Sequence, residues 1–322
     1  MVHPLTKINR LLRSKWLSVF TNLLTFTSFV FLIVYLYKFD YLSLEDIKIE
    51  WALLVISSLV LLLPVCGGVF AWKLALREYD IPISIISAIR SHGKSILAKY
   101  IPAPLIGVVG RAAMVSQEGH SLVSTSFVSL KLQVINLAIA LMLGMIPLFI
   151  MDVMASYRWF FAVVYIALIF LLFSERVQGF ALETFSKLTN QIIVVNANAR
   201  HGMWPVKFVT VCQYFIYSIS FLILVKCIYP EVNIIAAFAF PLSIAFGLIM
   251  FFIPGSIGIR EGIMAWFLNL SGVPLPIAVT VAIIARLWFL FGEIFLFTMG
   301  WLIKGKQERK TGFAVNKLNE SS

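Results

Sequence analysis

The chain has 322 residues, of which 61% are hydrophobic and 13% charged, and its mean hydropathy is +0.95. Soluble domains are about half apolar and a quarter charged, so this composition excludes a soluble globular protein. The net charge of +11 is typical of basic cytoplasmic loops beside anionic headgroups, and no motif indicates nucleic-acid binding.

Seven apolar runs predict membrane-spanning helices, each of which needs about 20 residues to cross a bilayer. They are 17–37, 51–75, 122–150, 159–173, 206–227, 234–253 and 276–303. Two further stretches, 81–116 and 254–272, are semi-apolar and interrupted. We therefore predict the all-α class: a polytopic membrane helix bundle of about eight spans. Residues 1–303 would form one membrane domain, and residues 304–322 would form a polar, disordered cytoplasmic tail.

Short loops rich in Lys and Arg indicate the cytoplasmic side. The segments before residue 17 and after residue 303 are basic, whereas 38–50 is acidic. This pattern predicts a multi-pass protein of the inner membrane, with both termini in the cytoplasm and an uncleaved first span. The parity requires 254–272 to cross as a broken helix, whereas a re-entrant hairpin, which the charge pattern disfavours, would leave the basic tail outside.

Two similar motifs interrupt the apolar pattern about 150 residues apart. YIPAPLIGVVGR occupies 100–111 and FIPGSIGIR occupies 252–260, which indicates a degenerate duplication with halves of about 1–175 and 176–303. Proline and glycine break helices, and the freed backbone groups cannot face lipid. We therefore expect two broken or re-entrant segments that line one polar cavity, as in many transporters. The predicted break residues are Pro102, Gly107, Pro254, Gly255, Gly258 and Gly262.

Ionisable residues in or beside the spans are candidates for binding an anionic head group. Arginine binds phosphate through paired hydrogen bonds, and charges within a membrane normally face a bundle interior or a cavity. The candidates are Lys99, Arg111, Lys131, Arg260, Glu261, Arg286 and Glu293. Glu261 and Glu293 would serve a cationic group or a proton. Three other interpretations remain open, namely a solvated surface turn at 260–261, a structural pair at 286 and 293, and a Lys131 that reaches the interface.

No catalytic or metal-binding motif is present in the sequence. The three cysteines, Cys66, Cys212 and Cys227, lie in or beside apolar runs without CxxC spacing, and the four histidines are scattered. They predict neither a disulfide framework nor a metal site. No phosphate-binding loop, HExxH or GxSxG motif occurs. We therefore expect no cofactor and no hydrolytic activity.

The segments KYIPAPLIGVVGRAAMVSQEG (99–119) and FFIPGSIGIREGIMAWFLNLSGVPLPIAVTVAIIARL (251–287) resemble the lysylphosphatidylglycerol synthase transmembrane-region family of flippase-like proteins. The resemblance implies about eight spans in two pseudo-symmetric halves, and a lipid substrate. It also implies functional positions in both motifs, which are Lys99, Tyr100, Pro102, Gly107, Arg111, Pro254, Gly255, Gly258, Arg260, Glu261 and Gly262. The first motif departs from the family at Ala103 and Pro104, and Lys131 stands where relatives carry a Glu-Arg pair.

The leading functional prediction is translocation of an anionic phospholipid or a polyprenyl-phosphate-linked lipid between membrane leaflets. The alternative is an integral membrane glycosyltransferase, or an accessory subunit in lipid-linked saccharide and cell-envelope biosynthesis. An enzyme would use acids on the outer side, such as Asp40, Glu45 and Asp152. Partners would be membrane lipids and either envelope-biosynthesis enzymes or a second copy of the chain, but no nucleic acid.

Overall fold

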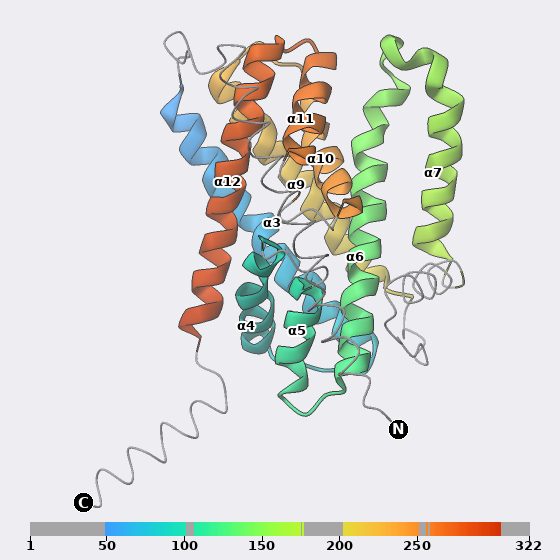
Figure 1. The fold of residues 1–322 in the computed structure, drawn as a ribbon, viewed down its shortest axis with the longest axis vertical. Coiled ribbons are helices and arrows are strands. Elements are labelled where there is room, and N and C mark those ends of the chain that lie inside the picture. The colour runs from blue at the N-terminus through green and yellow to red at the C-terminus, as the bar shows by residue number, and fades with distance from the viewer. Residues whose placement is uncertain are drawn as a thin grey trace, which may run out of the picture.

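The computed structural model describes residues 49–100, 106–174, 176, 202–250, 256 and 258–303. Every regular element in these ranges is a helix (Figure 1), so the predicted all-α class is confirmed. The α-helices are α3 (Trp51–Glu78), α4 (Ile85–Ile96), α5 (Ile106–Ser116), α6 (Leu122–Met145), α7 (Arg158–Phe173), α9 (Trp204–Ile228), α10 (Ala239–Ile249), α11 (Ile259–Leu270) and α12 (Leu275–Leu302). The 3-10 helices are η2 (Leu97–Tyr100), η3 (Ile146–Phe149), η4 (Asp152–Tyr157) and η5 (Ile234–Phe238).

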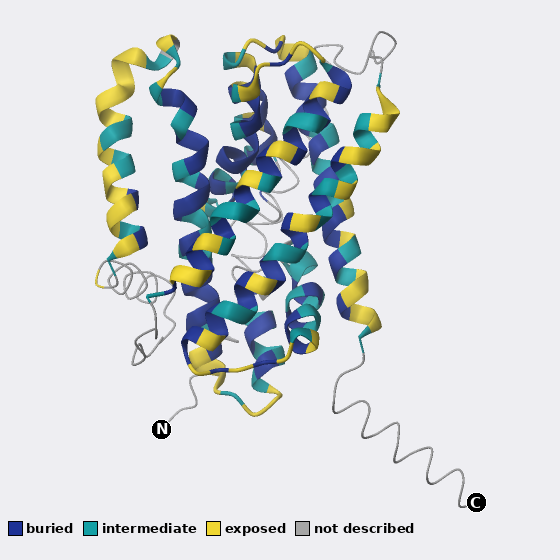
Figure 2. Cartoon of the chain, turned by 180° about the vertical axis from the view of Figure 1, so that it is seen from behind, coloured by how far each residue is buried: buried dark blue, intermediate teal, exposed yellow. Residues whose placement is uncertain are grey.

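Five helical stretches within the described residues are long and apolar enough to cross a membrane. They are Trp51–Glu78, Leu122–Phe149, Met154–Phe173, Trp204–Ile228 and Leu275–Leu302. Their outer faces carry exposed apolar side chains, most of all on α7, where Trp159 is 85% exposed (Figure 2). An apolar exterior is what lipid requires, so these helices indicate a multi-pass membrane protein. The predicted span 17–37 and the tail 304–322 lie outside the described residues.

The predicted span 234–253 is shorter in the structure than the sequence suggested. It begins as the 3-10 helix η5 and continues as α10, which has 11 residues. η5 and α10 together form one helix over Ile234–Ile249, which is shorter than the about 20 residues that a bilayer requires. α4, α5 and α11 have 12, 11 and 12 residues, so they too are shorter than a membrane span.

These four short helices form two hairpins at opposite ends of the bundle. α4 packs against α5, and α10 packs against α11. In Figure 1, α4 and α5 occupy the lower half and α10 and α11 the upper half. We call them the first hairpin and the second hairpin. The short α11, packed against α10, favours the re-entrant alternative for 254–272 over a full crossing. A hairpin begins and ends at the same end of the bundle, as two successive crossings would, so the predicted side of the basic tail is unchanged.

Glycines let each hairpin approach a long helix of the other part of the chain. A Cβ atom on Gly93 of α4 would lie 2.5 Å from the Leu296 carbonyl oxygen and 3.0 Å from Gly300 Cα, both in α12. A Cβ atom on Gly144 of α6 would lie 2.7 Å from Leu242 Cα in α10. Backbones this close leave no room for any side chain, so both crossings require glycine.

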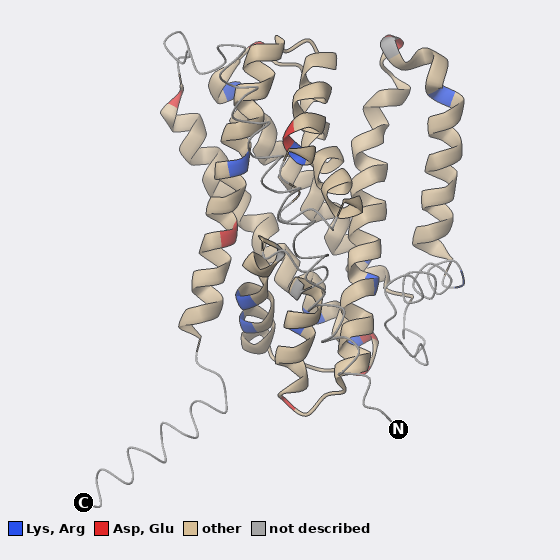
Figure 3. Ribbon diagram, in the orientation of Figure 1, with Lys and Arg blue, Asp and Glu red and all other residues tan. Residues whose placement is uncertain are grey.

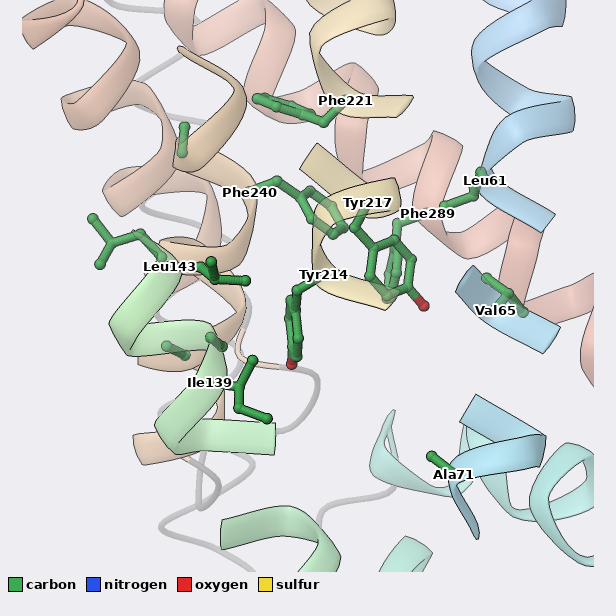
Figure 4. Packing of buried hydrophobic residues seen from close by; sticks show 14 of the residues in the cluster. Leu61, Val65, Ala71, Ile139, Leu143, Tyr214, Tyr217, Phe221, Phe240 and Phe289 are labelled. Carbon is green, nitrogen blue, oxygen red and sulfur yellow. The ribbon is translucent and has the colours of Figure 1, made fainter. Parts of the chain in front are cut away.

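An aromatic core fills the interior beside the second hairpin (Figure 4). Tyr217 of α9, Phe240 of α10 and Phe289 of α12 meet with ring centroids 5.3–5.8 Å apart. Phe221 and Trp288 extend the same group. Aromatic pairs at these separations contribute about 0.5–1.5 kcal/mol each beyond the area they bury. They hold α9, α10 and α12 together around the site described below.

We expect Gly93→Ala and Gly144→Ala each to destabilise the bundle by about 1–3 kcal/mol, because the added methyl group overlaps backbone atoms. Gly262→Ala is the matched control. It also lies in a helix, but its Cβ atom would meet nothing within 4 Å, and alanine favours helix by about 0.5–1 kcal/mol. Thermal unfolding in detergent should lower Tm for the first two variants only. An equal fall for Gly262→Ala would contradict this account.

Candidate functional site

The first turn of α11 places two charged residues inside the bundle. Gly258, with φ of 85°, precedes the helix in a conformation that favours glycine. Its backbone N–H donates to Glu261 Oε2 at 2.7 Å, so the carboxylate caps its own helix. Arg260 and Glu261 are only 7% and 8% exposed. This burial does not fit the alternative of a solvated turn at the membrane surface.

Two further charges come from one face of α12, one above the other. Arg286 Nε lies 3.6 Å from Glu261 Oε1, which forms an ion pair between α12 and α11. Glu293 is 1% exposed and accepts a hydrogen bond of 2.8 Å from the Tyr100 hydroxyl. Arg286 also lies over the Tyr100 ring, with its guanidinium carbon 5.2 Å from the centroid. Tyr100, the last residue of η2 in the first hairpin, therefore contacts both α12 charges.

Arg260 completes the group. Its guanidinium carbon lies 4.8 Å from the centroid of the Phe289 ring, and it interacts electrostatically with Glu261, Arg286, Glu293 and Tyr100. We call Arg260, Glu261, Arg286 and Glu293 the four-charge cluster.

The second hairpin makes room for the Arg260 side chain through a small residue. A Cβ atom on Gly247 of α10 would lie 2.8 Å from Arg260 Cγ and 3.2 Å from Ser256 Oγ. Ser256 Oγ donates to the Gly247 carbonyl oxygen at 2.7 Å, which holds the chain close to α10 just before α11 begins. The aliphatic part of Arg260 therefore lies where any larger residue at position 247 would place its side chain.

The four-charge cluster is electrically balanced and almost closed to solvent. It contains two arginines and two glutamates. Arg260, Glu261 and Glu293 are buried, and only 17% of the Arg286 side chain is exposed. Buried charges cost several kcal/mol each unless they are paired and hydrogen-bonded. The contacts to Gly258, Tyr100 and Phe289 reduce that cost. The predicted set of Arg260, Glu261, Arg286 and Glu293 is thus brought together in one place.

Arg111 lies in a different environment from Arg260, although the two follow matching motifs. In α5 it donates from Nε to Ser129 Oγ at 2.6 Å and from Nη2 to the Ser129 carbonyl oxygen at 2.8 Å. Its Nη1 lies 3.4 Å from His92 Nδ1, and its guanidinium carbon lies 4.6 Å from the Trp72 ring centroid. These partners hold the side chain between α3, α4, α5 and α6, so our expectation that one cavity would hold both arginines is not met by these contacts.

The packing of the two hairpins accounts for the difference. α5 packs on α6, whereas α11 packs on α12. Each arginine therefore lies against the long helix beside its own hairpin, Arg111 against α6 and Arg260 beside Phe289 of α12.

The remaining predicted residues are dispersed. Lys131 of α6 is 5% exposed and its Nζ lies 2.7 Å from the Tyr79 hydroxyl at the end of α3, so the side chain is buried between two helices. Gly107 and Gly262 lie within α5 and α11 rather than between helices. Pro102, Pro254 and Gly255 fall outside the described residues, as do Asp40, Glu45 and the side chain of Lys99. Asp152, an acid that the enzyme alternative would use, is fully exposed at η4, where it pairs with Arg158 at 3.3 Å.

Several polar groups of this interior were not predicted to belong to a site. Tyr100 was recognised only through the family resemblance, and His92 only as a scattered histidine. Gln213 of α9 lies against α3, where a Cβ atom on Gly68 would be 3.4 Å from Gln213 Nε2 and 3.2 Å from His92 Nε2. Gln213 Oε1 is buried without a hydrogen-bond partner within the part of the chain that the structure describes. A local sequence signal for Gln213 does exist, since a lone glutamine in an apolar helix is costly to bury.

Comparison of the chain with family models, curated proteins and solved structures finds no match. The resemblance of the two broken motifs to the flippase-like family therefore stays a prediction.

We expect Arg111→Gln to destabilise the protein by about 2–3 kcal/mol, because it removes charge-assisted hydrogen bonds that fix α5 against α6. Ser129→Ala should cost less, since the Ser129 carbonyl still accepts from Arg111. In a double-mutant cycle followed by thermal unfolding in detergent, the two changes should be clearly non-additive. Additive losses would show that the two side chains do not act as one unit.

Proposed function

We propose that this protein translocates lipids with an anionic head group between membrane leaflets, and that the four-charge cluster binds the head group. The observation that carries the proposal is the position of these charges. They lie where Tyr100, at the end of the first hairpin's α4–η2 segment, meets the start of α11 in the second hairpin. Ionisable groups buried in an apolar bundle are expensive and usually serve transport or proton movement.

The arrangement of helices supports two pseudo-symmetric halves. α4 packs on α12 and α10 packs on α6, while α5 packs on α6 and α11 packs on α12. α3 and α9 pack on each other between the halves. A two-fold relation that exchanges α3–α6 with α9–α12 would produce this set of pairs.

The opposite positions of the hairpins in Figure 1 favour an inverted repeat, which is the arrangement that alternating access uses in many transporters. In this proposal the two hairpins carry the broken backbone and α3 and α9 form the contact about which the halves move. With the first hairpin's open end on the cytoplasmic side, as the basic residues Arg77, Arg90 and Lys94 favour, α12 returns the chain to that side. The proposal therefore keeps both termini in the cytoplasm of a cell whose inner membrane holds the protein.

The head group would bind to Arg260 and Arg286, and its tails would remain in the bilayer beside the apolar outer faces. Arginine offers several donors in a plane and matches a phosphate oxygen pair. To reach them, the anion must replace the pairing with Glu261, because Arg286 is within 3.6 Å of that carboxylate. The bound state is therefore a rearrangement of existing ion pairs and adds few new charges to the interior.

The membrane-enzyme alternative has weaker support. Its acid in the described part of the chain, Asp152, is exposed on η4 and pairs with Arg158. The four-charge cluster is enclosed instead, and its carboxylates are held by Tyr100, Gly258 and Arg286. We therefore place the lipid-binding function in the cluster and assign none to Asp152.

The test is lipid movement in liposomes that contain only the purified protein. A fluorescent phosphatidylglycerol should move between leaflets faster than in protein-free liposomes, and faster than a fluorescent phosphatidylcholine, whose head group has no net charge. Arg260→Gln should slow the anionic probe about tenfold or more, since a charge-assisted hydrogen bond contributes about 1.5–3 kcal/mol. Arg158→Gln is the matched control, because this exposed arginine is outside the cluster.

Wild-type protein that moves the anionic probe no faster than empty liposomes would refute the proposal. If Asp152→Asn abolishes the protein's effect on lipid-linked saccharides in cells but leaves lipid movement in liposomes unchanged, the enzyme alternative is favoured instead. Arg260→Gln, Arg158→Gln and Asp152→Asn should each elute as folded protein in size-exclusion chromatography before they are compared.

A further inference from the structure

Arg111 is a buried cation that its described neighbours do not neutralise. It is 4% exposed, and it contacts Ser129, His92 and the Trp72 ring. Within the described residues no carboxylate pairs with it, whereas the four-charge cluster has a glutamate for each arginine. A buried charge without an opposite charge is costly, and a bound anion would offset that cost.

The Arg111 guanidinium has more N–H groups than it uses in these contacts. Nε donates to Ser129 Oγ, and one N–H of Nη2 donates to the Ser129 carbonyl oxygen. Nη1 lies 3.4 Å from His92 Nδ1, which is long for a hydrogen bond. The second N–H of each terminal nitrogen therefore has no acceptor in the part of the chain that the structure describes. A phosphate group accepts from two such N–H groups at once.

An unused acceptor lies beside the same histidine. Gln213 Oε1 of α9 is buried without a hydrogen-bond partner among the described residues. A Cβ atom on Gly68 of α3 would lie 3.2 Å from His92 Nε2 and 3.4 Å from Gln213 Nε2, so the two side chains meet at the bare backbone of α3. One imidazole nitrogen thus faces Arg111 and the other lies on the Gln213 side. We call Arg111, His92 and Gln213 the Arg111 site.

α9 connects this site to the four-charge cluster. Gln213 forms a side-chain hydrogen bond with Tyr217. The Tyr217 ring lies 5.8 Å from the ring of Phe289, and Arg260 lies over that same Phe289 ring. Figure 4 shows the Tyr217 hydroxyl pointing out of the aromatic core rather than into it. A head group that leaves one site therefore finds polar side chains on the way to the other.

We propose that the Arg111 site is a second binding site for the translocated head group, and that it selects a phosphate ester that carries a hydroxyl group. Arg111 binds the phosphate, and Gln213 Oε1 accepts a hydrogen bond from the hydroxyl. This inference rests on the proposed function and adds the substrate class. A phosphoglycerol head group has both parts. A phosphate ester of methanol has the same charge but leaves the Gln213 acceptor unpaired, which is the basis of the selection.

The experiment compares two anionic lipids in liposomes that contain the purified full-length protein. Phosphatidylglycerol and phosphatidylmethanol, each labelled on an acyl chain, differ only in the glycerol or methyl group on the phosphate. After subtraction of the rate in empty liposomes, wild-type protein should move phosphatidylglycerol about fivefold faster, because the methyl ester lacks one hydrogen bond to a buried group. Gln213→Leu should move the two lipids at equal rates.

The ratio of the two rates does not depend on how much of the protein is folded, because one preparation is measured with both lipids. Asn136→Leu in α6 is the matched control. Asn136 Nδ2 donates to the Leu132 carbonyl oxygen of its own helix at 2.8 Å, so this variant should keep the wild-type ratio. Arg111→Lys keeps the charge but loses the paired N–H groups, so it should slow both lipids and keep the ratio.

Four results would count against the proposal. A wild-type ratio in Gln213→Leu, or a lost ratio in Asn136→Leu, would overturn the assignment to Gln213. Unchanged rates in Arg111→Lys would overturn the role of Arg111. Equal movement of both lipids by the wild-type protein, faster than in empty liposomes, would overturn the selection of a hydroxyl and leave the proposed function standing. No movement of either lipid would overturn both.

Discussion

Backbone that leaves a helix inside a membrane must find hydrogen-bond partners within the protein, and this constraint governs the interior of the molecule. α4, α5, α10 and α11 each have only 11 or 12 residues, too few to cross a bilayer. They pack against the long helices α3, α6, α9 and α12. Long helices beside short ones allow the short ones to end within the bundle instead of in lipid.

Close contacts between helix backbones hold each hairpin against a long helix. Gly93 and Gly300 allow α4 to lie against α12, and Gly144 allows α6 to lie against α10. Where one hairpin meets the long helix of the other part of the chain, backbones touch. Small residues at such crossings provide dispersion contacts that replace the hydrophobic effect, which gives little net gain between helices in lipid. The same contacts connect the first hairpin to α12 and the second hairpin to α6.

The interior chemistry follows from this geometry. The start of α11 provides Arg260 and Glu261, α12 provides Arg286 and Glu293, and Tyr100 reaches them from the first hairpin. In a low-dielectric interior, each of these groups depends on the others, because an unpaired charge would be far more costly than a paired one. Because its two arginines and two glutamates balance, the cluster has no net formal charge in the interior.

The local sequence determined the long helices and the kind of side chains inside them. Apolar runs such as 51–75 and 206–227 exceed the length that a bilayer needs, and α3 and α9 cover them to within a few residues. The buried charges could also be named from the sequence, because an arginine within an apolar helix is too costly to face lipid. The end of α10 at Ile249 could not be predicted, since 234–253 is apolar throughout, and composition does not distinguish a membrane-spanning helix from a shorter one that packs among other helices.

Tertiary structure alone decided which charges meet. Tyr100 and Glu293 are 193 residues apart in the chain, and only the packing of the first hairpin against α12 joins them. The similarity of the two motifs suggested that Arg111 and Arg260 would share a cavity, but α5 packs on α6, and Arg111 contacts Ser129 and Trp72. A motif specifies residue types and a local break in the helix. The direction of each side chain depends on helical phase and on which distant helix lies opposite, and those are properties of the folded chain.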